Sequence, residues 1–171
     1  MCKPKIMSES LPIHQASAHD DLAVAHQWLA QVLTNFAKAE QAIGRLCIGV
    51  SLPIKNGPLG SVNELRNRLS KAEDRRCKNL EKRIERWQSL RPVRHVLAHA
   101  TVRVLFDENR NAVIVTRHLP RDEDDVTPDR IWSAEESLEV LRIASNDGRS
   151  IHDQVQNLLN DKKVIAQLRK P

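Results

Sequence analysis

An arginine and two histidines close together in the sequence are the residues best suited to chemistry. Arg94 and His99 are five positions apart, and His95 directly follows the arginine. An imidazole gains and loses a proton near neutral pH, so it can act as a general acid or base. A guanidinium stays charged and forks onto phosphate oxygens, which suits it to stabilising developing negative charge. The spacing alone carries little weight, because an arginine-rich chain contains such pairs by chance.

A long helix is predicted before this group. Apolar residues recur there in alternating steps of three and four, which places them on one stripe of a helix. Ser17, with Asp20 three residues later, predicts a capped start, and the Gly/Pro-rich residues 53–60 predict a loop after the helix. The residues of the stripe are Leu22, Ala25, Leu29, Val32, Phe36, Ala39, Ile43, Leu46 and Val50.

The arginine and both histidines fall on a short helix of their own. A second helix is predicted over residues 61–90, with its apolar side running from Val62 to Trp87. Pro92 interrupts it, and proline is tolerated in the first turn of a helix. We therefore expect a third helix over residues 92–100 that carries Arg94, His95 and His99.

A β-hairpin and a last long helix complete the folded part. Residues 101–106 and 112–119 are β-branched and apolar, and the Asn-containing stretch between them suits a tight turn. We expect an acidic loop over residues 121–129. Ser133 and Glu136 then match a capping box, which starts a helix reaching about Asn160. We favour one continuous helix, although a break at Gly148 stays open.

The fold class is therefore all-α. We expect an up-down bundle of four main helices plus the short motif-bearing helix, with the hairpin (about 101–119) inserted before the last long helix. The 171 residues fit a single domain with its own core. We assign residues 1–16 to a flexible leader, 17–160 to that helical domain and 161–171 to a C-terminal tail.

The composition excludes several classes of protein. No apolar run is long enough to cross a bilayer, and the N-terminus does not read as a secretory signal, so we expect a cytoplasmic protein without a membrane partner. The three cysteines are too dispersed for a disulfide framework or a zinc cluster. We expect no cofactor, and no metal, because His95 and His99 lack a third nearby ligand. The other five histidines form no motif, and we expect them on the surface.

The positive charge is concentrated next to the arginine and histidine group. Residues 64–94 hold 11 basic and five acidic residues, a net charge of +6, whereas the whole chain carries +5. One interpretation is a solvated helix face with i,i+4 ion pairs, such as Asp74 with Lys78. The other is a track for a phosphate backbone. The candidate RNA-binding residues of that track are Arg75, Arg76, Lys82, Arg83, Arg86 and Arg91.

The order of elements, together with the run from Arg94 to His99, resembles the HEPN superfamily. The resemblance covers roughly residues 20–160. Arg94 and His99 match that family's Arg-x4-6-His motif, and His95 fits its usually polar position after the arginine, while Ala100 stands where relatives often have Gly. The resemblance implies a helical domain, many of whose relatives are metal-independent ribonucleases. It also implies a homodimer whose two motifs face each other across one cleft.

Two functional hypotheses follow. RNA carries its own nucleophile, the 2′-OH, so Arg94 and His99, assisted by His95, could catalyse its cleavage in a toxin or defence effector. On a helix, however, a five-residue separation turns two side chains about 140° apart, so a second protomer would help to complete a site. The alternative is a non-catalytic dimer that binds RNA, a nucleotide or a protein such as an antitoxin. In that case His99 could be a helix-terminal residue and Arg94 an ion-pair partner of the acidic loop.

Overall fold

The computed structural model describes residues 13–53, 57, 59–109, 111–118 and 128–169, with only the backbone for residues 13–19. This part of the chain is mostly helical (71%), with a small antiparallel sheet. No helix in it is both long and apolar enough to cross a membrane. Its elements are α1 (Ile13–Gly49), α2 (Val62–Lys71), α3 (Arg75–Ser89), α4 (Arg91–His99), β1 (Ala100–Phe106), β2 (Ala112–His118), β3 (Arg130–Trp132), α5 (Ala134–Leu159) and α6 (Lys162–Leu168).

Helix α1 is the long helix that the apolar stripe predicts. Seven residues of the stripe, from Ala25 to Val50, are buried, and Leu22 and Leu29 are partly buried. The predicted cap at Ser17 is wrong, because α1 already includes residues 13–16 and Ser17 lies inside it. Residues 1–12 of the predicted leader lie outside the described residues.

The predicted second helix is two helices, so the prediction of one helix over residues 61–90 is wrong. Ala72 leaves the helical conformation (φ −67°, ψ 140°) and ends α2. Asp74 then caps α3 by accepting a hydrogen bond from the backbone N–H of Arg76 at 2.7 Å. The apolar spacing continues across this break, which is why periodicity alone suggested one helix. The turn lets Leu69 and Leu80 face the same core.

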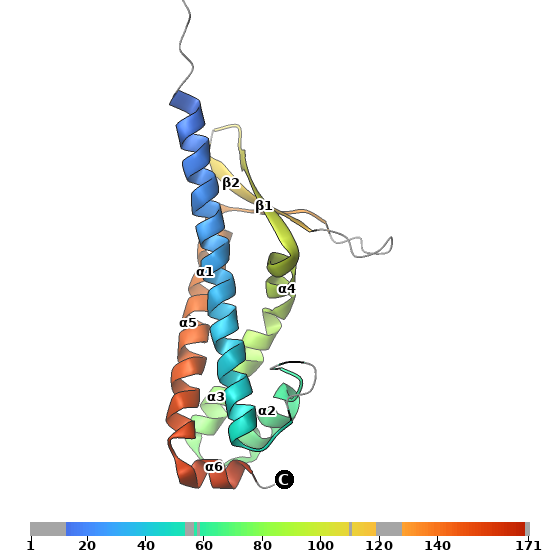
Figure 1. Ribbon diagram of the computed structural model, residues 1–171, viewed down its shortest axis with the longest axis vertical. Coiled ribbons are helices and arrows are strands. Elements are labelled where there is room, and N and C mark those ends of the chain that lie inside the picture. The colour runs from blue at the N-terminus through green and yellow to red at the C-terminus, as the bar shows by residue number, and fades with distance from the viewer. Residues whose placement is uncertain (1–12, 54–56, 58, 110, 119–127, 170–171) are drawn as a thin grey trace, which may run out of the picture.

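Helix α4 is confirmed, with Pro92 in its first turn. Leu90 is both the last cap of α3 and the first cap of α4, so the two helices follow each other without a loop. Because proline has no N–H, the hydrogen bond that would continue α3 is missing there and the helix axis changes direction. Figure 1 shows α4 leading from α3 toward the sheet.

The sheet has three strands rather than the predicted two. The hairpin of β1 and β2 is confirmed, with Ala100 opposite His118 and Phe106 opposite Ala112. The missed strand β3 pairs antiparallel with β2, with Trp132 opposite Ile114. Three residues are too few for the alternating pattern that reveals a strand. An all-α description is therefore too narrow: the chain is mostly helical with a small sheet.

The C-terminal part is more ordered than the sequence suggests. The capping box of Ser133 and Glu136 is present, and α5 runs through Gly148 without a break, as favoured. The predicted C-terminal tail, residues 161–171, contains the helix α6 over residues 162–168. Asp161 caps this helix by accepting from the backbone N–H of Val164 at 3.3 Å. Three apolar residues of α6 close the end of the core: Val164, Ile165 and Leu168.

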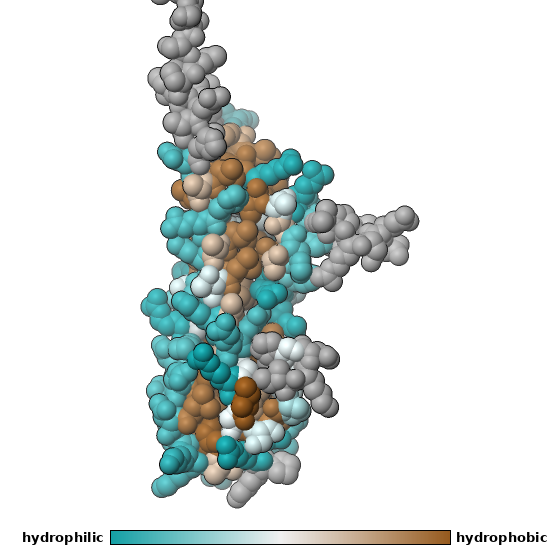
Figure 2. Space-filling view, viewed as in Figure 1, coloured by the Kyte–Doolittle hydropathy of each residue, from teal (hydrophilic) through white to brown (hydrophobic). Residues whose placement is uncertain are grey.

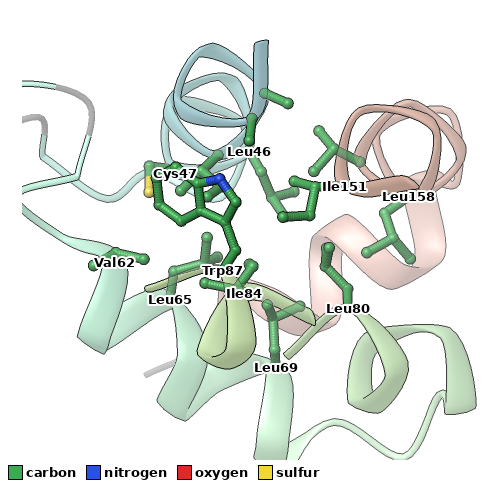
Figure 3. Close-up of a cluster of buried hydrophobic side chains, with 14 of the residues drawn as sticks. Leu46, Cys47, Val62, Leu65, Leu69, Leu80, Ile84, Trp87, Ile151 and Leu158 are labelled. Atoms are coloured by element: carbon green, nitrogen blue, oxygen red, sulfur yellow. The ribbon is translucent and has the colours of Figure 1, made fainter. Parts of the chain in front are cut away.

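The hydrophobic core lies between α1, α5 and the α2–α3 pair (Figures 1 and 3). Leu46 of α1, Ile84 and Trp87 of α3, and Ile151 of α5 meet there with almost no exposed surface. Near the sheet a second contact joins α1 to β3, where the rings of Trp28 and Trp132 lie 5.5 Å apart. This contact attaches the sheet to the helices.

The sheet leaves apolar side chains exposed on its outer face. Because side chains alternate along a strand and Trp132 points to α1, the registers place Leu105 and Ile131 on the opposite face. Leu105 is 51% exposed and Ile131 63%. Figure 2 shows further apolar surface at this end of the molecule, where α1 lies beside the sheet.

Close packing of α1 against α5 at Gly148 predicts a specific steric cost. A Cβ at Gly148 would lie 2.6 Å from the backbone oxygen of Asn35, which cannot move aside without shifting α1. Gly148→Ala should therefore lower the free energy of unfolding by about 1–3 kcal/mol, although alanine favours helices by about 1 kcal/mol over glycine. Urea unfolding monitored by circular dichroism measures this change.

Gly49→Ala is the matched control. A Cβ at Gly49 would also meet an atom at 2.6 Å, but that atom is Cδ2 of the flexible Leu159 side chain. This variant should lose much less stability. Equal losses in the two variants, or a more stable Gly148→Ala protein, would contradict rigid packing at this point.

Candidate functional site

Arg94 and His95 lie beside an open pocket at the start of α4. The pocket has a volume of about 620 Å³, within the range of roughly 300–1,000 Å³ typical of small-molecule sites. Arg91 adds a second guanidinium to it. The lining residues are Glu40, Leu59, Gln88, Arg91, Pro92, Arg94 and His95.

Glu40 of α1 holds Arg94 in place. The Nε and Nη2 atoms of Arg94 lie 3.1 and 3.2 Å from the two carboxylate oxygens of Glu40, a bidentate arrangement. The Arg94 side chain is 36% exposed and that of Glu40 16%. The partner among the described residues is therefore a residue of α1, whereas residues 121–127 of the acidic loop, which the sequence suggested as a partner, lie outside the described residues. No local motif marks Glu40, so sequence reasoning missed it.

His95 and His99 lie side by side on the exposed surface of α4. Their ring centroids are 4.8 Å apart, with the planes tilted by 58°. This proximity follows from their i,i+4 spacing, which puts two side chains on one face of a helix. Two adjacent imidazoles can divide the roles of proton acceptor and proton donor.

One protomer does not bring Arg94 and His99 into one pocket. His99 is exposed at the last position of α4 and is not among the described residues that line the pocket of Arg94. The regular helix keeps the two side chains on different sides, as their spacing requires. His95 contacts both groups of residues, because it lines the pocket and also faces the His99 ring.

The basic residues of α3 are partly neutralised by carboxylates from other elements. Arg83 and Arg86 both pair with Asp147 of α5, whose side chain is only 2% exposed. Arg76 pairs with Asp74 and with Asp161. Except for the local Arg76–Asp74 pair, these ion pairs join α3 to α5 or to the start of α6, unlike the i,i+4 pairs that a solvated helix face would have.

Three of the six candidate RNA-binding residues form no ion pair within the described part of the chain: Arg75, Lys82 and Arg91. Arg75 and Lys82 are exposed and seven positions apart, so they lie on one stripe of α3. Arg91 lies at the pocket beside Arg94. Cations that form no ion pair among the described residues are therefore present both on α3 and at the candidate site.

The Arg76 guanidinium also affects the acids that it contacts. It donates hydrogen bonds to both carboxylates, and this lowers the pKa of Asp74 and the pKa of Asp161 below their usual value. Both acids are thus charged at neutral pH and keep Arg76 engaged. This network caps α3 and connects it to the start of α6.

Cys47 and Cys77 are not candidate nucleophiles. Both are buried and unbonded, and burial raises the pKa of each thiol to about 11. A thiol with such a pKa is protonated at neutral pH and reacts slowly. Cys2 lies outside the described residues.

The remaining histidines are not all on the surface. His118 is buried on β2, 6% exposed, where the sequence predicted an exposed residue, because its strand is the central one of the sheet. His26 is exposed and His152 partly exposed. No three His, Cys, Asp or Glu side chains among the described residues come together as metal ligands would.

Comparison of the chain with protein-family models, with curated proteins and with solved structures finds no match. The resemblance to the HEPN superfamily thus stays a prediction that rests on residues 94–99 and on the order of the elements.

Proposed function

We propose that this protein is a metal-independent endoribonuclease of HEPN type that acts in the cytoplasm, as a toxin or defence effector. The observation that carries the proposal is the arrangement on α4: two adjacent exposed imidazoles, 4.8 Å apart, beside an open pocket that contains Arg91 and Arg94. This combination offers proton transfer and phosphate binding within one short helix. The exposed Arg75 and Lys82 add a positive approach for the RNA backbone.

The chemistry needs only the RNA itself and these side chains. His99 accepts the proton of the 2′-OH, and the oxygen attacks the adjacent phosphorus. Arg94 stabilises the charge that develops on the phosphate oxygens. His95 donates a proton to the departing 5′-oxygen. The products are a 2′,3′-cyclic phosphate and a 5′-hydroxyl end.

A homodimer supplies the geometry that one protomer lacks. Because Arg94 and His99 lie on different sides of α4, we assign each active site to Arg94 of one protomer and His99 of its partner. Strand β1 directly follows α4 in the chain, and the outer face of its sheet exposes Leu105 and Ile131. Apolar surface of this kind is commonly buried in protein–protein contacts. We also propose that the helices of each protomer form the up-down bundle of four main helices that the sequence predicts.

The second candidate function is a non-catalytic dimer that binds RNA, a nucleotide or a regulatory protein such as an antitoxin. The bidentate pair of Arg94 with Glu40 favours it, because an arginine held by a carboxylate inside its own chain can serve a structural role. This candidate predicts binding without turnover. Substitution of His99 would then leave binding unchanged.

RNA cleavage in the presence of EDTA separates these two functions. The wild-type protein should cut single-stranded RNA and leave 2′,3′-cyclic phosphate ends. His99→Ala should lower the rate by about 10²–10⁴-fold, the usual contribution of a general acid or base. Arg94→Ala should lower it by about 10²–10³-fold, the usual loss of one group that stabilises transition-state charge.

Two controls make the assay specific. Lys163→Ala removes an exposed lysine of α6 that forms no ion pair among the described residues, and it should cleave like wild type. A DNA oligonucleotide of the same sequence should not be cut, because it lacks the 2′-OH that acts as the nucleophile. Equal rates for wild type, Arg94→Ala and His99→Ala would remove the assignment.

Glu40→Gln tests whether RNA competes with Glu40 for Arg94. Glutamine keeps a hydrogen-bond acceptor but loses the charge, so Arg94 should bind a phosphate more readily. Exposed ion pairs contribute about 0.2–1 kcal/mol, so we expect the KM for RNA to fall by about two- to fivefold. Steady-state kinetics on a short RNA measures this value. An unchanged or higher KM would show that Glu40 does not compete with the substrate.

A further inference from the structure

A second polar pocket lies between α1 and α5, away from α4. It has a volume of about 260 Å³. Two of its lining residues are close to Glu40 in sequence but point in other directions from the helix axis. Successive residues of a helix point about 100° apart, so Gln41 points about 100° away from Glu40. Lys38, two positions from Glu40, points about 160° away from it. The pocket is therefore on the other side of α1 from the Glu40–Arg94 ion pair. Its lining residues are Asn35, Lys38, Gln41, Arg45, Arg149 and His152.

The regular spacing of two helices brings these residues together. Lys38, Gln41 and Arg45 recur at steps of three and four, so they form one stripe along α1. Arg149 and His152 are three positions apart on α5 and face the same groove. The contact of Gly148 with the Asn35 backbone brings the two helices close together at this point.

The charges lining this pocket all have the same sign. Lys38, Arg45 and Arg149 are cationic, and no carboxylate lines the pocket. None of the three forms an ion pair within the described residues, and Asp147 and Asp153, the acids on either side of Arg149 along α5, pair with none of them. Three cations in one groove repel each other at a cost that a bound anion removes.

Another pocket among the described residues, which three arginines line, differs in this respect. Arg83, Arg86 and Arg142 line a pocket of about 450 Å³ together with Asp147. Asp147 pairs with Arg83 and Arg86, and Glu139 pairs with Arg142. Each of those three cations already pairs with an acid of the protein, although Arg83 and Arg86 share one. Only the α1–α5 pocket, among the described pockets, combines several cations with no acid.

We propose that the α1–α5 pocket binds a phosphate group. Two guanidinium groups can each fork onto phosphate oxygens, and the ammonium of Lys38 adds a third positive charge. The side-chain amides of Asn35 and Gln41 and the imidazole of His152 supply further hydrogen-bond donors. This set matches the acceptor-rich surface of a phosphate better than that of a carboxylate, which has fewer oxygens.

The size of the pocket restricts the ligand further. Its volume lies slightly below the roughly 300–1,000 Å³ of sites for drug-sized ligands. It therefore accommodates a phosphate with a part of the attached group, and the rest of the ligand extends into solvent. The same chemistry is present in a free mononucleotide and in an RNA backbone. The site is separate from α4, so its occupation does not depend on the proposed cleavage.

Binding measurements with three probes test this site. Isothermal titration calorimetry of the full chain measures the affinity for each probe. The probes are inorganic phosphate, adenosine monophosphate and a short 2′-O-methyl RNA. The RNA probe lacks a free 2′-OH and cannot be cleaved, so the titration reports binding alone. At least one probe should bind the wild type. The double variant Arg45→Gln, Arg149→Gln should weaken that binding at least about tenfold, because each removed charge-assisted hydrogen bond is a strong one.

Matched variants make the result specific. Arg103→Gln and Lys163→Gln remove exposed cations from β1 and α6 and should leave the affinity unchanged. All four replaced side chains are exposed, so the fold should tolerate their loss. If the double variant loses binding of adenosine monophosphate, the ligand is a free nucleotide. If it loses binding of the RNA but not of the nucleotide, the ligand is a backbone phosphate.

Two results would overturn the proposal. One is that no probe binds the wild-type protein. The other is that the double variant binds every probe as tightly as the Arg103→Gln control. His99→Ala, which should abolish cleavage, should bind the same probe like wild type. If the protein does not cleave RNA, the titrations still test the phosphate site. If no probe binds, the cleavage assay still tests the proposed ribonuclease activity.

Discussion

The contact between α1 and α5 determines where both candidate sites lie. Gly148 lets the two helices approach until a Cβ would clash with the Asn35 backbone, and the buried core extends from there to α2, α3 and α6. From this fixed position α1 presents Glu40 to Arg94 on one side and Lys38 toward α5 on the other. A shift of α1 would alter the ion pair and the basic pocket together. The functional surfaces thus depend on packing as well as on their own residues.

Ion pairs between elements decide which cations remain available to a polyanion. The basic segment 64–94 has partners outside itself: Asp147 neutralises Arg86, and Asp161 binds Arg76. Its positive charge at the surface is therefore smaller than a count along the sequence suggests. Pairs with an exposed partner contribute only about 0–1 kcal/mol, so RNA can compete for them. Cations that form no ion pair among the described residues include Arg75 and Lys82 on one stripe of α3, Arg91 at the start of α4, and the three cations of the α1–α5 pocket.

Elements with a strong local pattern could be predicted, whereas those defined by tertiary contacts could not. The apolar stripe of α1, the proline before α4, the hairpin and the Ser133 capping box each have a physical cause within a few residues. The break between α2 and α3 at Ala72 could not be predicted, because the apolar spacing continues across it. Strand β3 and helix α6 are short and exist because Trp132 and Leu168 fill the core. For the same reason the sequence identified Arg94 and His99 but not Glu40, whose role arises from a contact across 54 residues.

The geometry of α4 makes the central claim testable. A regular helix keeps Arg94 and His99 on different sides, so the proposed active site joins Arg94 of one protomer to His99 of its partner. Mixed dimers of Arg94→Ala and His99→Ala chains, isolated with two affinity tags, contain one intact combination of this kind. We expect them to cleave RNA at about half the wild-type rate, while each parent variant cleaves at least about 10²-fold more slowly than wild type. Mixed dimers as inactive as both parents would contradict a site shared between protomers.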